Sequence, residues 1–207
     1  MFKHETQVIK FLLQWYSMNA RKLPWRKKNN LNLPHPYFVF VSEYMLQQTT
    51  VNTVKNKFND FILKWPSLNK LAQTSEPNIL EFWSGLGYYS RARNLLKSAK
   101  IINKNFKNNI PKTYDELIQL PGIGDYTAKA ILGIGYNKSV MPLDANIERI
   151  LVRLHAIDKP INKVKNKLKD LGKKFISDKY SSNLIQSFMD YGSEICLPRN
   201  PKCNICG

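Results

Sequence analysis

The sequence is short of cysteine, of acidic residues and of long apolar stretches. The first 195 positions hold no cysteine, and Cys196, Cys203 and Cys206 all lie within the last twelve. This distribution excludes the disulfide framework of a small secreted domain. No stretch approaches the roughly 18 apolar residues that span a bilayer, and Phe11-Leu12-Leu13 is too short for a signal core. We therefore expect a soluble, intracellular protein of the cytoplasm.

The scarcity of acidic residues leaves a strong positive charge. Lysine and arginine number 32 against 15 aspartate and glutamate residues, for a formal net charge of +17. Such an excess favours a polyanionic partner, which is nucleic acid, an anionic membrane surface or an acidic protein. Lys, Asn and Ile are abundant, and an AT-rich genome would favour these residues in any protein whatever its function. The charge alone therefore does not choose between these explanations.

Internal repeats and period-two alternation are absent too, which excludes a repeat protein and a sizeable sheet. Apolar residues instead recur at helical spacing, as in Val8, Phe11, Leu12 and Trp15. The sequence predicts an all-α protein with a joint near Ser139–Pro142. The predicted helices cover the N-terminal segment and residues 37–47, 51–64, 76–84, 89–105, 113–120, 125–136, 144–156, 163–176 and 181–195.

The most informative segment is 113–136, which predicts two helices joined by a tight glycine turn. Thr113 and Glu116 have capping-box spacing, and Leu120-Pro121-Gly122-Ile123-Gly124 follows. Glycines let the backbone reverse sharply and approach a ligand, and Asp125 is predicted to cap the second helix. The loop amides and the positive end of that helix would seat a phosphate. We interpret the segment as a helix-hairpin-helix element that holds DNA by its backbone.

This hairpin, followed by Leu143-Asp144, resembles the helix-hairpin-helix superfamily of base-excision DNA glycosylases. Three more blocks resemble its A/G-specific adenine glycosylase branch (MutY), and the match runs from about residue 7 to the last residue. The blocks are Leu23-Pro24-Trp25-Arg26, Ser42-Glu43-Tyr44-Met45-Leu46-Gln47-Gln48-Thr49, and Gly85-Leu86-Gly87-Tyr88-Tyr89-Ser90-Arg91-Ala92-Arg93-Asn94-Leu95.

The resemblance implies a two-lobed fold with the active site in the cleft between the lobes. Residues 30–138 would form the lobe that contains the hairpin, and residues 1–29 with 139–207 would form the other. The substrate implied is double-stranded DNA that carries adenine opposite 8-oxoguanine or guanine. The protein would act as a nucleoid-associated monomer in base excision repair, and it would have no membrane partner.

Two carboxylates are the candidate catalytic groups. Glycosidic bond cleavage needs an acid for the leaving base and an anion for the sugar cation, which glycosidases divide between two carboxyl groups. Glu43 lies in an apolar helix where burial would help it keep a proton. Asp144 begins a helix whose dipole would keep it ionised. The resemblance implies that Glu43 protonates adenine, that Asp144 stabilises the cation and that Asn146 orients Asp144.

One hairpin position separates a simple hydrolase from a lyase. Bifunctional relatives carry a lysine two residues after the last hairpin glycine, and its amine forms a Schiff base with the sugar. Here that position is Tyr126, which cannot form an imine. We therefore predict a monofunctional glycosylase, with Lys129 in a surface role.

An enzyme that acts on a base within a duplex must open the base pair. Gln48 and Tyr88 match the family's intercalating and wedging positions, and Gly122 and Gly124 its backbone-binding turn. Arg91 and Arg93 begin the next helix and are candidates for phosphate contacts or for solvated charges.

The adenine pocket is implied at three further positions. Trp25 and Arg26 resemble the adenine-side residues of the family, although the loop from Arg26 to Tyr37 is longer than usual. Gln186 lies ten residues before Cys196, where the family places a group that binds the edge of adenine. Its amide offers a donor and an acceptor, as adenine does.

The three cysteines resemble the first three ligands of the family's four-cysteine [4Fe–4S] loop. Cys196, Cys203 and Cys206 are separated by six and then two residues, and thiolates at such spacing suit iron–sulfur ligation. The fourth ligand would fall just past Gly207. Either this sequence is a truncated form of a longer protein, or the cluster is incomplete or lost. We favour truncation and expect a structural cluster in the full-length protein. The domain that recognises 8-oxoguanine in full-length members would also be missing.

Two alternatives remain at this point. A thymine-directed mismatch glycosylase shares the Tyr126 and Asp144 pattern but lacks the glutamate-bearing block around Glu43. A catalytically inactive DNA-binding fragment would keep the hairpin without the chemistry. Both predict DNA affinity that falls steeply with salt.

Overall fold

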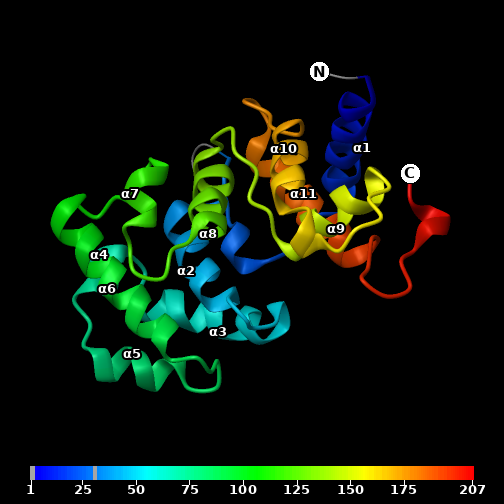
Figure 1. Cartoon of the computed structure of the whole chain (residues 1–207). Coiled ribbons are helices and arrows are strands. Elements are labelled where there is room, and N and C mark those ends of the chain that lie inside the picture. Colours follow the sequence, from blue (N-terminus) through cyan, green and yellow to red (C-terminus); the bar gives the residue numbers. More distant parts are fainter. Residues whose placement is uncertain (1–2, 30–31) are drawn as a thin grey trace. The chain divides into compact units, whose positions relative to one another are not determined.

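The computed structural model describes residues 3–29 and 32–207, which form helices joined by loops (Figure 1). No strand occurs in that part of the chain, where an isolated bridge joins Lys28 and Pro34. The predicted all-α fold is confirmed. The α-helices are α1 (Lys3–Asn19), α2 (Pro36–Leu46), α3 (Val51–Lys64), α4 (Leu68–Ala72), α5 (Glu76–Trp83), α6 (Ser90–Asn105), α7 (Tyr114–Ile118), α8 (Asp125–Ala130), α9 (Ala145–Leu154), α10 (Lys165–Lys173) and α11 (Ser181–Glu194).

Four short helical turns complete the order of elements. They are the 3₁₀ turns η1 (Pro24–Arg26), η3 (Ile161–Lys163) and η4 (Cys203–Ile205), and the π-helical turn η2 (Ile131–Gly135). The π turn follows α8 directly, so the helix predicted over 125–136 changes its hydrogen-bond pattern halfway. None of the helices in the described part of the chain combines the length and the apolar character that crossing a bilayer requires.

The chain divides into two compact units, one of residues 22–136 and one of residues 1–21 with 137–207. The first boundary lies at Arg21 and Lys22, earlier in the chain than the expected position at 29 and 30. The second lies at Tyr136 and Asn137, close to the expected joint. Residues 30 and 31, at the start of the expected first lobe and within the long loop, lie outside the described residues.

The unit of residues 22–136, called the hairpin unit below, packs α2 against α3, α6, α8 and η2. Short polar caps begin several of its helices, since Thr50, Ser67, Ser75 and Thr113 each accept a hydrogen bond from a first-turn amide. Gly135 lets α2 approach, because a Cβ there would lie 3.2 Å from the Pro36 backbone. Its largest fully buried side chains include Phe40, Tyr44, Phe58, Phe61 and Trp83.

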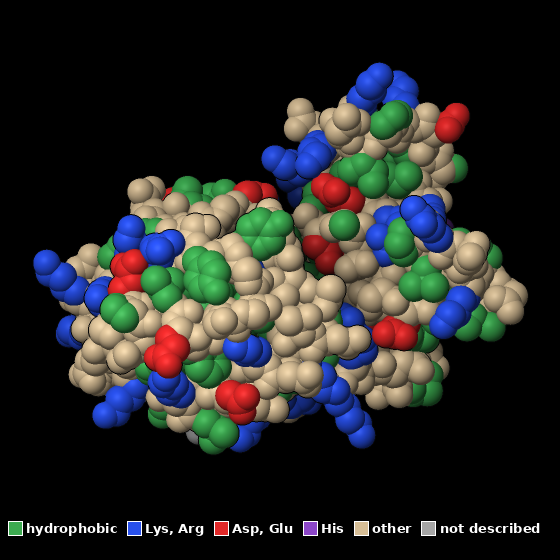
Figure 2. All heavy atoms as spheres, turned by 90° about the horizontal axis from the view of Figure 1, so that it is seen from below, with side chains coloured by type: hydrophobic (Ala, Val, Ile, Leu, Met, Phe, Trp, Pro, Cys, Tyr) green, Lys and Arg blue, Asp and Glu red, His purple; other side chains and the backbone are tan. Residues whose placement is uncertain are grey.

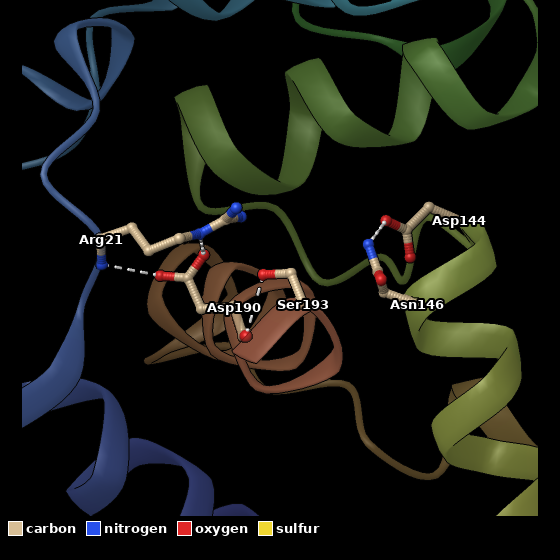
Figure 3. A network of polar contacts seen from close by, with 5 residues as sticks. All are labelled: Arg21, Asp144, Asn146, Asp190 and Ser193. Carbon is tan, nitrogen blue, oxygen red and sulfur yellow. Dashed lines mark hydrogen bonds and ion pairs between the residues drawn. The ribbon is translucent and has the colours of Figure 1, made fainter. Parts of the chain in front are cut away.

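The unit of residues 1–21 and 137–207, called the cysteine unit below, packs α11 between α1 and α9. Its core contains Phe175 and Phe188, whose rings meet edge to face at 5.4 Å. Asp190 of α11 is fully buried and binds Arg21, through its Nε at 2.6 Å and its backbone N–H at 3.0 Å (Figure 3). This partly buried ion pair joins the segment after α1 to α11.

Basic side chains are spread over one face of the molecule. Figure 2 shows lysine and arginine side chains scattered across this face, with no single basic patch standing apart. The charge on this face therefore does not by itself mark a nucleic-acid site.

Candidate active site and nucleic-acid interface

The hairpin between α7 and α8 forms as the sequence predicts, except at its second cap. Thr113 Oγ1 accepts from the Glu116 amide at 3.4 Å and donates to the Glu116 carboxylate at 2.6 Å. Gly122 has φ +81°, in the left-handed region. A Cβ on Gly122 would also lie 3.0 Å from the side chains of Asn94 and Tyr44. Glycine is therefore required at this turn by both conformation and space.

The prediction that Asp125 caps α8 is wrong. The N-cap residue is Gly124, and no side chain caps this end. Asp125 instead forms an ion pair with Lys129 at 2.8 Å and accepts a hydrogen bond from the Tyr114 hydroxyl at 2.9 Å. The ion pair accounts for Lys129, while Tyr126 is the second residue of α8 and is half-buried.

The hairpin turn is attached to α2. Tyr44 donates from its hydroxyl to the Pro121 carbonyl at 2.5 Å, and Gln47 donates from Nε2 to the Gly122 carbonyl at 3.2 Å. Burial raises the pKa of Tyr44 well above its usual value, so this phenol stays a donor. The turn after α2 and the hairpin turn are thus neighbours.

The Gln48 and Tyr88 turns both adopt strained conformations in the hairpin unit. Gln48 follows α2 with φ +56°, and Tyr88 precedes α6 with φ +47°. Residues other than glycine seldom adopt positive φ unless the surroundings impose it. Both side chains are exposed, and Tyr88 keeps 62% of its surface accessible. They are therefore available to meet a ligand.

Arg91 is not a phosphate contact, contrary to the sequence-based suggestion. It is 6% exposed, and its guanidinium donates to main-chain carbonyls from the end of α2 and from the loop before α6. Arg93, by contrast, forms an exposed ion pair with Glu76 at 2.8 Å. Sequence reasoning missed the role of Arg91 because its partners are carbonyl groups, which leave no signature in the residue pattern.

Glu43 lies in the last turn of α2 and is 6% exposed. Apolar residues of the same helix, Val39, Phe40 and Leu46, lie one turn away from it, as the sequence indicates. Trp25 of η1 is also buried, and its ring meets Phe58 edge to face at 5.5 Å. Arg26 ends η1 and is half-buried.

Asp144 is the N-cap of α9 in the cysteine unit. Its Oδ1 accepts from the Ile147 amide at 2.7 Å and its Oδ2 accepts from Asn146 Nδ2 at 2.9 Å, so the two side chains point toward each other (Figure 3). Asn146 Oδ1 in turn accepts from Arg149 Nη2 at 2.9 Å. Each oxygen of the carboxylate is thereby fixed in direction.

The expectation that the helix dipole controls the ionisation of Asp144 is incomplete. Burial raises the pKa of Asp144 above its usual value, and the hydrogen bonds from Ile147 and Asn146 oppose this effect without cancelling it. Desolvation disfavours the charged form of a carboxyl group. The sequence showed the helix end, but it did not show the surroundings of the side chain.

Gln186 lies on α11 and is 2% exposed. Its Nε2 donates to the Ser182 carbonyl at 3.0 Å and to the Ser182 hydroxyl at 3.2 Å. Its Oε1 is buried and has no hydrogen-bond partner among the described residues. A buried amide oxygen without a partner is costly and calls for an explanation.

The three cysteines share one cavity in the cysteine unit. The cavity has a volume of about 440 Å³ and is bounded by α1, α9 and the segment after α11. Arg153 Nη1 lies 3.3 Å from Cys196 Sγ, and the Tyr191 hydroxyl lies 3.3 Å from Cys206 Sγ. Within residues 3–29 and 32–207, no group of three or more potential ligand side chains is arranged to hold a metal ion.

Cysteine is the ligand type that an iron–sulfur cluster requires, but the sequence has one cysteine too few for a [4Fe–4S] cluster. Cluster iron takes cysteine thiolates, four of them for [4Fe–4S], and the sequence contains three cysteines. Cys203 and Cys206 are exposed and Cys196 is half-buried. The three thiols border one cavity, but in the described part of the chain they are not gathered into a ligand group.

These positions fall into two groups. In the hairpin unit the structure brings together the Gln48 turn, the Tyr88 turn and Gly122, and the same unit contains Glu43 and Tyr126. In the cysteine unit it pairs Asp144 with Asn146 and places the three thiols around one cavity.

Comparison with known proteins identifies the class to which this arrangement belongs. The model of the HhH-GPD superfamily base excision DNA repair proteins matches residues 41–174. The chain therefore belongs to the HhH-GPD superfamily of base excision DNA repair proteins. The matched segment includes Glu43, the hairpin and Asp144.

Individual relatives narrow the similarity within that superfamily. The chain is 45% identical over 197 residues to the adenine DNA glycosylase of Buchnera aphidicola subsp. Baizongia pistaciae, covering 94% of this chain and 54% of that protein. It is 36% identical over 215 residues to the human adenine DNA glycosylase, covering 100% of this chain and 39% of that protein. The chain thus spans about half the length of the bacterial relative.

Solved structures share the fold. A thermostable thymine-DNA glycosylase superposes with a TM-score of 0.86 at 24% identity, over 99% of this chain and 93% of that one. An endonuclease III in a non-covalent complex with DNA superposes with a TM-score of 0.75 at 20% identity, over 100% of this chain and 93% of that one. At these identities the match establishes the fold alone.

Proposed function

We propose that the protein is a monofunctional DNA glycosylase that hydrolyses the N-glycosidic bond of adenine mispaired with 8-oxoguanine or guanine. The observation that carries the proposal is the similarity to proteins named adenine DNA glycosylase over 94% of the chain. The candidate carboxylates Glu43 and Asp144 lie within the part that is similar. The proposed substrate is double-stranded DNA, and the proposed form is a monomer.

In the proposed reaction the bond between the sugar C1′ and the adenine nitrogen breaks, and the oxygen of a water molecule bonds to C1′. The proton that this water loses replaces the one that Glu43 gives to the base. Glu43 gives its proton to the departing base, which leaves as neutral adenine. The bond electrons leave with the base, so positive charge develops on the sugar. Asp144 stabilises that charge as an anion, with Asn146 holding its direction.

The burial of Glu43 supports its role as the acid, because desolvation favours the protonated form of a carboxyl group. The position of Tyr126 supports hydrolysis without a lyase step. A phenol forms no imine with the sugar, and Lys129 is engaged in an ion pair with Asp125.

Duplex opening is assigned to Gln48 and Tyr88. Both are exposed on turns with positive φ, and both belong to the unit that contains the hairpin. The backbone of Gly122 and Gly124 would bind phosphate oxygens beside them, because Gly124 begins α8 without a side-chain cap. A flipped adenine then becomes accessible to the carboxylates.

Adenine recognition is assigned to Gln186, with Trp25 and Arg26 as further pocket residues. The Oε1 atom of Gln186 accepts no hydrogen bond from the described residues, which supports this role. The exocyclic amine of adenine could donate a hydrogen bond to it. Trp25 packs on Phe58 inside the protein, so its proposed role in the adenine pocket rests on the family resemblance alone.

Cys196, Cys203 and Cys206 would supply three ligands of a [4Fe–4S] cluster. The cluster would organise the segment around the cavity and take no part in hydrolysis. Arg199 and Lys202 in that segment would then present positive charge to DNA phosphate.

The function is tested with two duplexes, one with an A·8-oxoguanine mispair and one with a T·G mispair. We expect strand breaks at the adenine after alkali treatment, and none without it. Breaks at thymine would favour the thymine-directed alternative. Binding without any break would favour an inactive DNA-binding module.

A further inference from the structure

Arg91 is a buried cation that the proposed chemistry leaves unused. Its side chain reaches two segments distant in sequence, the end of α2 and the loop between α5 and α6. Nη1 donates to the carbonyls of Tyr44 at 3.2 Å and Met45 at 2.8 Å, and also to that of Gln47. Nη2 donates to the carbonyls of Leu86 at 2.8 Å and Gly87 at 3.0 Å.

Nη1 of the guanidinium therefore binds the turn at the end of α2, and Nη2 binds the loop before α6. The carbonyls at the end of α2 have no partners further along the helix and carry partial negative charge, so a cation there is stabilising. A planar guanidinium can bind both sets of carbonyls at once. An ammonium group has three donors at a single point and cannot bridge two sets in this way.

The residues that follow these carbonyls are the two proposed duplex-opening residues. Gln48 comes directly after Gln47, and Tyr88 directly after Gly87. Both have positive φ, a conformation that persists only where neighbouring contacts impose it. The Tyr88 ring also lies over the guanidinium, with 5.6 Å between Arg91 Cζ and the ring centroid.

The hairpin turn is joined to the same arrangement through Gln47. Its carbonyl accepts from Arg91, while its side chain donates to the Gly122 carbonyl. A second cation holds the loop from its other side, because Lys57 Nζ donates to the carbonyls of Phe82 at 2.9 Å and Ser84 at 2.5 Å. Three turns are thus linked within one unit of the chain.

We propose that Arg91 is a positioning residue that holds the Gln48 and Tyr88 turns in their duplex-opening arrangement before DNA is bound. This inference rests on the proposed function, because it assigns the two turns to base-pair opening. The turns lose their conformational entropy when the protein folds. The free energy barrier to base flipping therefore does not include the cost of ordering them.

The test compares one adenine in two contexts. The first duplex carries it in an A·8-oxoguanine pair, and the second carries it in a short bubble whose bases are already unpaired. For Arg91→Lys we expect the single-turnover excision rate to fall about a hundredfold on the paired duplex. On the bubble we expect a much smaller loss, because little opening is needed there.

Ile102→Val is the matched control. Ile102 is fully buried in the same helix, and its apolar side chain makes no hydrogen bond to the Gln48 turn or to the Tyr88 turn. It lowers stability without altering the guanidinium contacts, so its rates on the two substrates should change together. Equal losses of Arg91→Lys on paired and bubble substrates would overturn the inference and indicate a purely structural role.

Lys57→Met extends the test to a residue whose loss leaves the core intact, and it serves if Arg91→Lys does not fold. We expect about a tenfold loss on the paired duplex and little change on the bubble. Equal losses on both substrates, relative to the unaltered protein, would contradict the proposal. Failure of the unaltered protein to excise adenine from either substrate would instead contradict the proposed function.

Discussion

The two units of the chain hold their candidate functional groups by different means. In the hairpin unit the turns are fixed by hydrogen bonds of the protein itself, centred on buried Arg91. In the cysteine unit the segment after α11 is held by Arg149 and Arg153, which bind the carbonyls of Cys196 and Leu197, and by Tyr191, whose hydroxyl contacts Cys206 Sγ. The thiols of that segment face a cavity. The turns of the hairpin unit are thus joined to one another by hydrogen bonds, whereas the thiols of the cysteine unit border a cavity.

The two candidate carboxylates, one in each unit, also differ in their surroundings. Glu43 lies inside an apolar helix, which suits a group that must carry a proton. Asp144 is fixed in direction by an amide and by Asn146, and these hydrogen bonds favour its anion against the burial that raises its pKa. The acid and the anion of the proposed mechanism thus belong to different units of the chain.

The largest effect is expected from Glu43→Gln in the hairpin unit. Glutamine keeps the size of the side chain but cannot donate a proton to the base, so the single-turnover excision rate should fall about 10²–10⁴-fold. Quenched-flow or manual sampling of adenine release measures the rate. Affinity for the mispaired duplex, measured by fluorescence anisotropy, should stay within about threefold of the unaltered protein. Excision at the normal rate would remove Glu43 from the mechanism.

Asp144→Asn should give the next largest loss. Asparagine is as good an N-cap as aspartate, so α9 should keep its start while the negative charge is lost. We expect excision to fall about 10²–10³-fold. Asn146→Ala should reduce the rate less, because the carboxylate would lose its direction but not its charge. An Asp144→Asn variant with full activity would contradict the assignment.

The same variant tests the pKa of Asp144. Because burial raises this pKa in the folded state, ionised Asp144 costs stability, and its favourable contribution is lost as the pH rises from about 4 through the raised value. Urea unfolding should therefore show Asp144→Asn gaining stability relative to the unaltered protein as pH increases from 4 to 7. A difference that shrinks over this range would show that the pKa is lowered instead.

Part of this account could be predicted from residue patterns. The helix 51–64 is found at its expected bounds, and Thr113 begins α7 as its spacing indicates. The helix α4 (Leu68–Ala72) was not expected, because five residues are too few to show a period. The pairing of Asp125 with Lys129 fits the i,i+4 spacing of opposite charges on a helix, but the sequence offered capping and pairing as competing roles for Asp125.

The site was less predictable than the fold. Candidate residues could be named because their types suit the chemistry, but the surroundings of each one depend on packing. Arg91 resembles an exposed cation at a helix start, and only the folded chain shows that it is buried among carbonyls. The raised pKa of Asp144 has the same origin, since burial is a property of the whole unit.

Tyr126→Lys should produce a smaller, qualitative change by adding an amine at the lyase position. Sodium borohydride should then trap a covalent protein–DNA adduct, visible as a slower band in denaturing electrophoresis. The unaltered protein should give no such adduct. Lys129→Ala is the control, and an adduct that disappears with this substitution would mean that Lys129 acts on the sugar.

The smallest effect is expected from replacing Cys196, Cys203 and Cys206 together by serine. If the cysteine segment only contributes to DNA binding, affinity should fall less than about tenfold, or about 1.4 kcal/mol, while the excision rate of bound DNA stays the same. Iron and sulfide analysis of anaerobically purified protein measures the cluster directly. A loss of catalysis as large as that of Glu43→Gln would contradict a purely structural role.

The most direct test of the central claim is to identify the free base that the protein releases. A duplex that carries both an A·8-oxoguanine and a T·G mispair is incubated with the protein, and the small-molecule fraction is examined by mass spectrometry. The account predicts free adenine, with none released by Glu43→Gln. Release of thymine, or of no base from a protein that binds the duplex, would contradict it.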